Sequence, residues 1–403
     1  MKKWKLYLYI VIIIVCSCII LNTAWQHRPK WPKKSVKLAH IYLDASSFPT
    51  LLQMLDLVQN QPQGPKLISW QRITDTKPIK KKIKNAKIVK HIPYHLAEYW
   101  PELEEALRDF VAYYPNAQFI VHVNKDQNNL VWTVLRIVPR ERIKELHLYE
   151  ESFGHTSYQG SPLYSPEKAQ QVLSGFRRPQ HFEPNLAFSL ISFYPQSVVH
   201  VALADMALKN PKAKPLHQAG RIEEVDWTKI SQQLTPKQKQ DLLELNHITP
   251  EILKPFTSNK PTVLYTLTFM FNKHNEDEKQ LDVLRQIFSG KSKWFSDTEK
   301  YTWMYKEHPW HVKDSYLHDN IVKNWPFMYG LPKQIPLEVF FLTGYMPDKV
   351  FGYSSALFFS IPAEKIAFYI RRPGIDPYIP ILKKMHKITD EQIVSLEDFH
   401  VQS

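Results

Sequence analysis

The sequence has few glycines and almost no cysteines, and both shortages narrow its chemistry. Of 403 residues, 10 are glycine and 2 are cysteine, and Cys16 and Cys18 both lie in one hydrophobic segment near the N-terminus. The rest of the chain therefore has no thiol for an intrachain disulfide, a zinc–thiolate site or a catalytic cysteine. It also lacks G-x-x-x-x-G-K-[ST] and G-x-G-x-x-G, the glycine-rich loops of the common nucleotide-binding folds.

The charge of the chain is unbalanced, with a formal net charge of +13. Much of the excess lies in residues 28–37 and 77–90. A basic surface attracts nucleic acid, anionic lipid, acidic glycans or sugar nucleotides. The second cluster has no aromatic residues among its lysines, which argues against a nucleic-acid platform, and we expect no nucleic-acid partner. The first cluster directly follows the hydrophobic segment, which favours attraction to a membrane surface.

The hydrophobic segment, residues 6–21, predicts an N-terminal membrane anchor helix. It is slightly shorter than the roughly 20 residues of a spanning helix, but residues 22–25 can extend it to an interfacial Trp25. No small-residue cleavage site follows, which favours a retained anchor over a removed signal peptide; a lipoprotein signal ending at Cys18 is the alternative. Positive charge is heavier downstream, so the positive-inside tendency predicts a single-pass protein with a cytoplasmic body.

Strand-like and helix-like runs alternate in two series after the anchor, which predicts βαβ units and parallel sheets. We expect an α/β protein with two Rossmann-like domains that face each other across a ligand-binding cleft. The predicted regions are an anchor and basic linker over residues 1–36, a first domain over 37–190, a second domain over 191–385, and a C-terminal helix over 386–403 that could pack back on the first domain.

Polar residues follow several of the predicted strands, at the positions where open α/β sheets bind ligands. His308 follows the strand-like run 301–305, Glu338 begins an apolar run, and Ser354 and Ser355 precede another. An imidazole can donate to a phosphate oxygen, a carboxylate can hold ribose hydroxyls, and serines can cap a helix whose N-terminus binds phosphate. This combination predicts a nucleotide-binding half-site and a nucleotide-sugar transferase.

An acidic pair, Glu150 and Glu151, closes the predicted strand 143–149 of the first half. A carboxylate near apolar walls or beside another carboxylate has a raised pKa, which suits a general base. A solvated acidic turn is the alternative, and the sequence leaves open which of the two glutamates would act as the base.

These motifs, taken in order, resemble the bacterial multifunctional sialyltransferases. The resemblance covers about residues 37–396. It rests on five segments: Ile41-Tyr42-Leu43-Asp44-Ala45-Ser46-Ser47; Leu146-His147-Leu148-Tyr149-Glu150-Glu151; Val225-Asp226-Trp227-Thr228 with Gln232 to Pro236; Tyr305-Lys306-Glu307-His308-Pro309; and Leu342-Thr343-Gly344 through Pro347-Asp348-Lys349-Val350 to Ser360-Ile361-Pro362. It implies the GT-B fold and transfer of sialic acid from CMP-sialic acid to a galactose-type hydroxyl, with inversion and without a metal or cofactor.

The resemblance also implies a role for individual residues on the donor side. Glu151 falls at the position of the general base, and His308 at that of the histidine that assists departure of the CMP phosphate. Glu338 corresponds to the glutamate that holds the ribose. The other implied donor contacts are Lys306, Pro309, Thr266 and Ser355, with Ser354 displaced by one position.

The acceptor side departs more from the family pattern. The implied acceptor contacts are Ser47, Gln127, Phe271 and Trp310, of which the last three replace a histidine, a tryptophan and an arginine. Ser152 and Glu307 also stand where the family has glycine, and Ala356 where it has a second serine. The acceptor and the linkage, α2,3 or α2,6, therefore stay open.

Two alternatives remain beside a sialyltransferase of surface glycans such as lipooligosaccharide. One is a transferase for another CMP-activated acid, such as Kdo, and the other is a membrane-tethered glycan-binding protein that keeps the fold without catalysis. The expected partners are CMP-sialic acid, a glycan acceptor and the bacterial inner-membrane surface.

Overall fold

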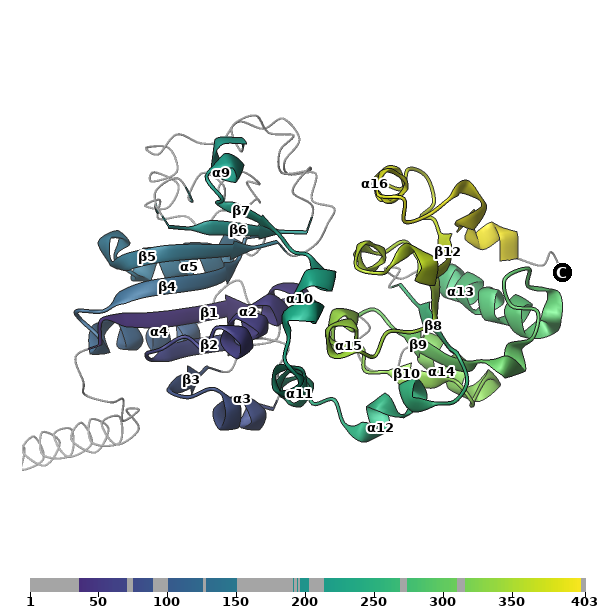
Figure 1. Cartoon of the computed structure of the whole chain (residues 1–403), viewed down its shortest axis with the longest axis horizontal. Helices are drawn as coiled ribbons and strands as arrows, with labels where there is room; N and C mark the ends of the chain where they lie inside the picture. The colour runs from purple at the N-terminus through teal and green to yellow at the C-terminus, as the bar shows by residue number, and fades with distance from the viewer. Residues whose placement is uncertain are drawn as a thin grey trace, which may run out of the picture.

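The computed structural model describes residues 36–70, 75–89, 101–125, 128–150, 191, 194, 196–202, 214–268, 274–309 and 316–399. These residues form two α/β domains, each built on a sheet of parallel strands, and the domains lie side by side along the long axis of the molecule (Figure 1). The two-domain α/β architecture predicted from the sequence is therefore confirmed. Within the described residues, no helix is long and apolar enough to cross a membrane, and residues 1–35, which include the predicted anchor, lie outside them.

The first sheet has seven strands in the order β3-β2-β1-β4-β5-β6-β7, and every pairing is parallel. The strands are β1 (Leu38–Asp44), β2 (Lys66–Trp70), β3 (Ala86–Ile88), β4 (Gln118–Asn124), β5 (Ile143–Tyr149), β6 (Val198–Val201) and β7 (Ile222–Glu224). The helices that accompany them are α2 (Ser47–Gln59), α3 (Lys77–Lys82), α4 (Pro101–Tyr113), α5 (Asn128–Ile137) and α9 (Lys214–Gln218).

The second sheet has six parallel strands in the order β10-β9-β8-β11-β12-β13. They are β8 (Thr262–Thr266), β9 (Thr302–Lys306), β10 (Tyr329–Leu331), β11 (Lys349–Tyr353), β12 (Ile366–Ile370) and β13 (Ile393–Val394). Its helices are α13 (His274–Gln286), α14 (Tyr316–Asn324), α15 (Leu337–Thr343) and α16 (Ile379–Lys384). β8 is buried along its whole length, as expected for the centre of a sheet covered on both faces.

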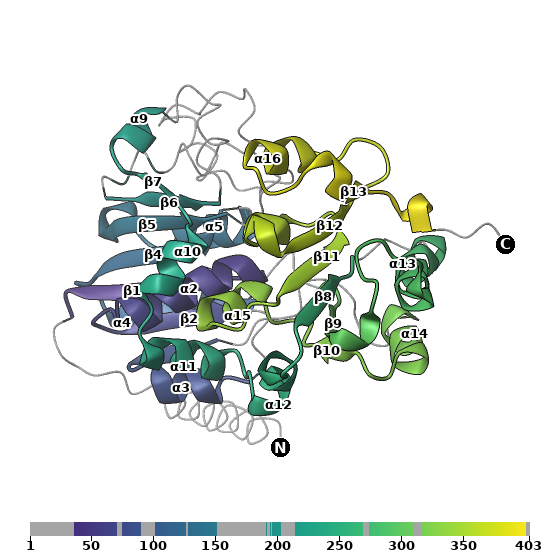
Figure 2. The same cartoon turned by 45° about the vertical axis from the view of Figure 1, so that its right-hand side comes forward.

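Three helices connect the domains: α10 (Trp227–Gln233), α11 (Pro236–Leu245) and α12 (Pro250–Leu253). Thr235 and Gln238 form a complete capping box at the beginning of α11, and a proline stands in its first turn. α10 and α11 both contact α15 of the second domain, and α11 also contacts α2 and α3 of the first. Figures 1 and 2 show these helices between the two sheets.

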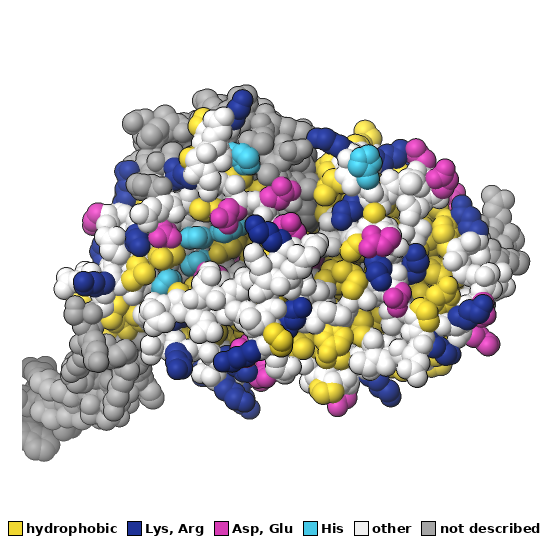
Figure 3. All heavy atoms as spheres, in the orientation of Figure 1, with side chains coloured by type: hydrophobic (Ala, Val, Ile, Leu, Met, Phe, Trp, Pro, Cys, Tyr) yellow, Lys and Arg dark blue, Asp and Glu magenta, His cyan; other side chains and the backbone are white. Residues whose placement is uncertain are grey.

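A row of histidine and tyrosine rings crosses the first sheet. Tyr42 stacks on His122 with ring centroids 4.2 Å apart, His122 on His147 at 4.7 Å, and Tyr149 on His200 at 4.6 Å. Strand pairing produces this row, because Tyr42 pairs with His122, His122 with His147, and Tyr149 with His200. Histidine side chains accordingly gather on the face of the first domain that Figure 3 presents.

Two of the predicted boundaries require correction. The first sheet continues through β6 and β7, so the change from one sheet to the other comes between Glu224 and Thr262 and not at residue 190. The segment 386–403 is not one helix: within its described part, up to residue 399, short 3-10 turns flank β13, which pairs with β12. Phe399 stacks on Phe368 of β12, so this segment completes the second domain.

Candidate functional site

The carboxyl edge of the second sheet collects the donor-side residues that the sequence predicts. Thr266, the last residue of β8, pairs with Lys306 at the end of β9 and with Gly352 in β11. Because the three strands are parallel and in this register, the loops that follow them leave the sheet at the same edge. His308 and Pro309 follow β9 in one of these loops, and Ser354 and Ser355 follow β11 in the other.

Gly352 is required for this close approach. A Cβ atom at this position would lie 2.0 Å from Thr266 Oγ1 and 2.4 Å from the Thr266 carbonyl oxygen. Its φ of +156° is also one that L side chains rarely adopt. The absence of a side chain thus lets β11 and β8 meet directly beside Thr266, which is itself buried.

A buried lysine lies at the centre of this edge. Lys306 is 6% exposed, and its Nζ donates to the Lys333 carbonyl at 2.9 Å. Pro309, three residues further on, accepts at its carbonyl from Gln334 Nε2 at 3.3 Å. The two hydrogen bonds tie the loop that carries His308 to the segment after β10. The loop therefore starts from a buried lysine and carries, two residues further on, the partly buried His308.

Glu338 is the buried carboxylate of this site. It lies in the first turn of α15 and accepts from Ser360 Oγ at 3.3 Å. Burial raises the pKa of Glu338, and the nearby positive charge of Lys306 acts in the opposite direction. The carboxylate and the ammonium are thus electrostatically coupled, which brings together two residues that are 32 positions apart in the sequence.

The serines after β11 are held by backbone and side-chain contacts. Ser354 is buried, and its Oγ accepts from Arg372 Nε at 3.0 Å. Ser355 Oγ accepts from the backbone N–H of Leu357 at 3.3 Å and caps the short 3-10 turn that follows. Arg372 is not among the predicted site residues, although the pair Arg371-Arg372 directly follows the apolar run that forms β12.

The carboxyl edge of the first sheet has a different chemistry. Asp44, at the end of β1, is fully buried and accepts from Thr50 Oγ1 at 2.6 Å, from Asn124 Nδ2 at 3.0 Å and from Ser46 Oγ at 3.2 Å. Asn124 is the last residue of β4, so this network joins two neighbouring strand ends. Ser47, which we expected on the acceptor side, is the first residue of α2 and directly follows Ser46.

Glu150 lies at the same edge. It directly follows β5 and is 3% exposed, and its Oε2 accepts from the backbone N–H of Ala202 at 3.1 Å. This bond holds the carboxylate against the end of β6. Four other predicted site residues lie outside the described residues: Glu151, Gln127, Phe271 and Trp310.

A chain of helix contacts links the two edges. Phe48, next to Ser47 at the start of α2, packs edge-on against Trp227 of α10 with ring centroids 5.2 Å apart. Ser231 of α10 in turn donates to the Leu342 carbonyl of α15, the helix that carries Glu338, at 3.3 Å. The start of α2 and the helix with the buried carboxylate are therefore only one helix apart.

Among the described residues, no group of three or more His, Cys, Asp or Glu side chains is arranged to hold a metal ion. The side chains present at the second edge include an ammonium, an imidazole, hydroxyls and a guanidinium, beside the buried carboxylates of Glu307 and Glu338. The first four are hydrogen-bond donors and cations that can bind a phosphate. The first edge supplies carboxylates and an amide, with the buried Lys125 directly after β4.

Part of the chain matches a described protein family. Residues 187–374 match the family described as sialyltransferase PMO188. No curated protein sequence matches the chain.

Several solved structures share the fold. A 2,6-sialyltransferase of a Photobacterium species, solved with CMP and lactose, has a TM-score of 0.72 at 19% identity, over 89% of this chain and 78% of that one. An α/β-galactoside α2,3-sialyltransferase of Photobacterium phosphoreum has a TM-score of 0.70 at 19% identity, over 90% of this chain and 100% of that one. The sialyltransferase of Photobacterium damsela has a TM-score of 0.68 at 18% identity, over 89% and 81% of the two chains.

Proposed function

We propose that this chain is a sialyltransferase, which moves sialic acid from CMP-sialic acid to a galactose-type hydroxyl. The family match over residues 187–374 and the shared fold confirm the resemblance predicted from the sequence, and they support the prediction of an enzyme. The complex of the Photobacterium 2,6-sialyltransferase with CMP and lactose supports a CMP-sugar donor and a galactoside acceptor for this chain.

The observation that carries this proposal is the grouping at the carboxyl edge of the second sheet. Strand register aligns Thr266 with Lys306, and Glu338 is close enough to Lys306 for their charges to interact. A phosphate bound at this edge would meet the ammonium of Lys306, the imidazole of His308 and the hydroxyl of Ser355, and Glu338 would hold the ribose hydroxyls. Cations and donors fixed in advance suit a phosphate that gains charge in the transition state.

The proposed reaction is a single displacement. The acceptor hydroxyl attacks C2 of the sialyl unit, the new C2–O bond forms as the C2–O bond to the CMP phosphate breaks, and the configuration at C2 inverts. A carboxylate of the pair Glu150 and Glu151 accepts the hydroxyl proton, and Glu151 is our assignment for the base. C2 is tertiary, so the transition state has oxocarbenium character, and the negative charge on departing CMP is stabilised by His308 and Lys306. No metal takes part in this scheme.

Release of CMP tests the proposal directly. Purified protein is incubated with CMP-sialic acid and lactose, with CMP-Kdo as a parallel donor, and products are measured by mass. We expect sialyl-lactose, and we expect His308→Ala and Glu151→Ala each to lower turnover by at least about 10²-fold, the lower bound for acid–base catalysis. Exposed His217→Ala is the control. Normal turnover in both active-site variants would refute the assignment, and transfer from CMP-Kdo alone would replace the donor.

The proposal also covers the acceptor of the reaction and the location of the protein in the cell. We assign a surface glycan such as lipooligosaccharide as acceptor, and residues 1–36 as an inner-membrane anchor with the body in the cytoplasm. Fractionation of cells with an antibody against the body checks the setting, because a body found in the soluble fraction would overturn it.

A further inference from the structure

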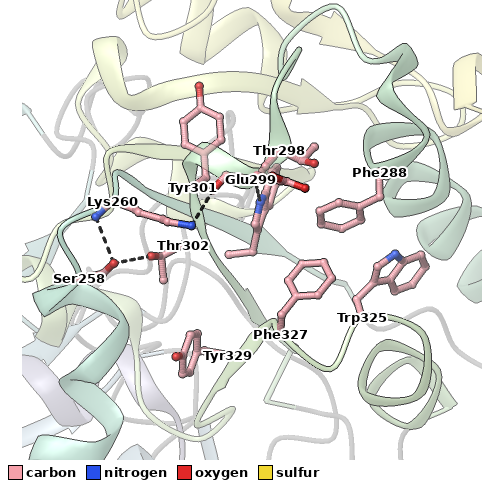
Figure 4. Close-up of a pocket in the computed structure, with 11 residues that line it drawn as sticks. Ser258, Lys260, Phe288, Thr298, Glu299, Tyr301, Thr302, Trp325, Phe327 and Tyr329 are labelled. Atoms are coloured by element: carbon pink, nitrogen blue, oxygen red, sulfur yellow. Dashed lines mark hydrogen bonds between the residues drawn. The ribbon is translucent and has the colours of Figure 1, made fainter.

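A cavity of about 680 Å³ lies at the edge of the second sheet opposite to the candidate donor site (Figure 4). It is lined by Ser258, which precedes β8, by Thr302 at the start of β9 and by Tyr329 at the start of β10. Thr266 and Lys306, by contrast, end their strands. Because a strand rises about 3.3 Å per residue, this cavity is a strand's length away from the donor site and has no part in the proposed transfer.

One wall of the cavity is aromatic. Six of its eleven lining residues carry aromatic rings: Phe288, Tyr301, Trp303, Trp325, Phe327 and Tyr329. The rings support each other, since Phe288 packs edge-on against Trp303 at 4.9 Å and against Phe327 at 5.2 Å between centroids. Such a wall is rigid, and it offers ring surface to a bound molecule.

Two of these rings are unusually exposed. Phe327 is 53% exposed and Tyr329 is 40% exposed, whereas Met328 between them is buried. Phe327 lies in a turn directly before β10, and Tyr329 is the first residue of that strand. Exposed aromatic residues that line one cavity are typical of a binding surface.

The other wall is polar and is fixed by hydrogen bonds. Thr302 Oγ1 donates to Ser258 Oγ at 2.7 Å, and the backbone N–H of Lys260 donates to the same oxygen at 3.1 Å. Lys260 Nζ donates to the Glu299 carbonyl at 2.8 Å. With two donors directed at its oxygen, Ser258 can offer its own proton to a ligand. The wall thus presents hydroxyls at fixed positions.

The charges around the cavity balance. Its lining contains one cation, Lys260, and one carboxylate, Glu299. An anionic ligand would gain little here, because the ammonium is already hydrogen-bonded and the carboxylate would repel it. The chemistry therefore favours an uncharged ligand with one apolar face and a polar rim.

A sugar ring has this division, since its C–H bonds gather on one face and its hydroxyls form the rim. We propose that this cavity is a second glycan-binding site, which takes one or two neutral hexose units. The apolar face of the sugar stacks on Phe327 and Tyr329, and its hydroxyls bond to Ser258 and Thr302. Together with transfer at the opposite edge, such a site would hold the enzyme on a surface that carries many acceptor chains.

Photo-crosslinking with peptide mapping tests the site. The full chain is irradiated with a diazirine-bearing lactoside, a neutral disaccharide, and labelled peptides are identified by mass. We expect label within residues 298–303 or 325–329, and we expect excess lactose to compete it away. The double variant Phe327→Ala/Tyr329→Ala should lower this label at least 10-fold. Tyr113→Ala is the matched control, because Tyr113 is 38% exposed on α4 of the first domain.

A second variant guards against misfolding. Tyr329→Ala alone removes a ring that is 40% exposed, and we expect a loss of label without a change in thermal unfolding, whereas Tyr329→Phe should keep the label. Three results would overturn the inference. They are the absence of label in these peptides, label that excess lactose does not reduce, and equal label in the double variant.

Failure of the second glycan-binding site and failure of the proposed transferase activity can be told apart. His308→Ala should abolish transfer and leave this label intact. Absence of transfer from any CMP-sugar would refute the proposed function alone, and transfer without label in these peptides would refute the second site alone.

Discussion

The carboxyl edges of the two sheets have the same architecture but carry different sets of polar side chains. The first has buried carboxylates and an amide at successive strand ends, Asp44, Asn124 and Glu150, and one buried cation, Lys125, directly after β4. The second has the buried cation Lys306 and the buried hydroxyl of Ser354, together with the buried carboxylates Glu307 and Glu338. In the proposed transfer, the first edge would supply the group that accepts a proton, and the second edge would supply the groups that stabilise charge on the leaving group.

The interiors of the two sheets differ as well. The stacked row in the first sheet consists of histidine and tyrosine, whereas the corresponding stack in the second is formed by Tyr265, Phe351 and Phe368. Histidine titrates near neutral pH and phenylalanine does not. The two sheets should therefore respond differently to acid.

The largest effect that we expect is a loss of stability of the first domain in acid. Burial lowers the pKa of His40 from 6.5 to about 4, and burial also lowers the pKa of His122 and His200. The unfolded chain takes up these protons near pH 6.5 and the folded chain only at lower pH, so stability falls as the pH drops from about 6.5 towards 4.

Urea unfolding at pH 7.5 and 5.0 measures this effect. His40 alone should account for a loss of about 2 kcal/mol in the free energy of unfolding between these values. His40→Phe should reduce the difference, and exposed His217→Gln should leave it unchanged. Equal free energies of unfolding at both pH values would contradict the claim that the histidines of the first sheet make it sensitive to acid.

The next effect concerns the cation of the second edge. Lys306→Met should lower kcat/KM for CMP-sialic acid by about 10²-fold, because a charge that stabilises the transition state is lost. Lys66→Met is the matched control, since Lys66 is 5% exposed and donates to the Gly64 carbonyl at 3.0 Å but lies at the beginning of β2. Steady-state kinetics of both variants would contradict the assignment if the two losses were equal.

A smaller effect is expected at the buried carboxylate. Glu338→Gln should raise KM for CMP-sialic acid about 10-fold, as expected for loss of a hydrogen bond from ribose to a charged group. Because the folded pKa of Glu338 is raised, its ionisation opposes folding as the pH rises, and the variant should be at least as stable as the parent above pH 7. A large loss of stability at unchanged KM would instead assign Glu338 to the packing of α15.

The smallest effect should come from the residue that positions Ser354. Arg372→Gln removes the bond to Ser354 Oγ and should raise KM about 3- to 5-fold, with kcat little changed. Kinetics of Ser354→Ala provide the reference, because both variants should behave alike if Arg372 acts through the serine. A fall in kcat with Arg372→Gln alone would show a direct role in the reaction.

The grouping of Thr266, Lys306, His308 and Ser355 at one edge of the second sheet follows from parallel strands, which bring the residues at their ends to one edge. The role of these residues in donor binding stays a prediction. Two strands, β2 and β11, have sequences that do not indicate a strand clearly, and each has a local reason. β2 begins with Lys66, a charged residue whose ammonium is satisfied by the Gly64 and Lys84 carbonyls in the folded chain only. β11 contains Gly352, which weakens any strand pattern but is needed for contact with Thr266.

The domain boundary was predicted too early, at residue 190, because the segment before it has the amino-acid composition of a linker. Residues 152–185 are rich in Ser, Gly, Pro and Gln, yet they connect β5 and β6, which pair side by side in one sheet. Strand pairing between segments so far apart in sequence depends on long-range packing, which local patterns do not record. For the same reason, the ring row of the first sheet was not foreseen from its scattered histidines.

The missing side chain at Gly352 has a consequence for protein engineering. Two strands touch there without any space for an added methyl group, so alanine at this position would push apart the backbones that align the donor edge. Mutant libraries meant to change the preference of the proposed donor site should therefore keep Gly352 constant and randomise the loops that follow the neighbouring strands. The fraction of variants that fold would then depend on the loop substitutions, because the contact between β8 and β11 would be unchanged.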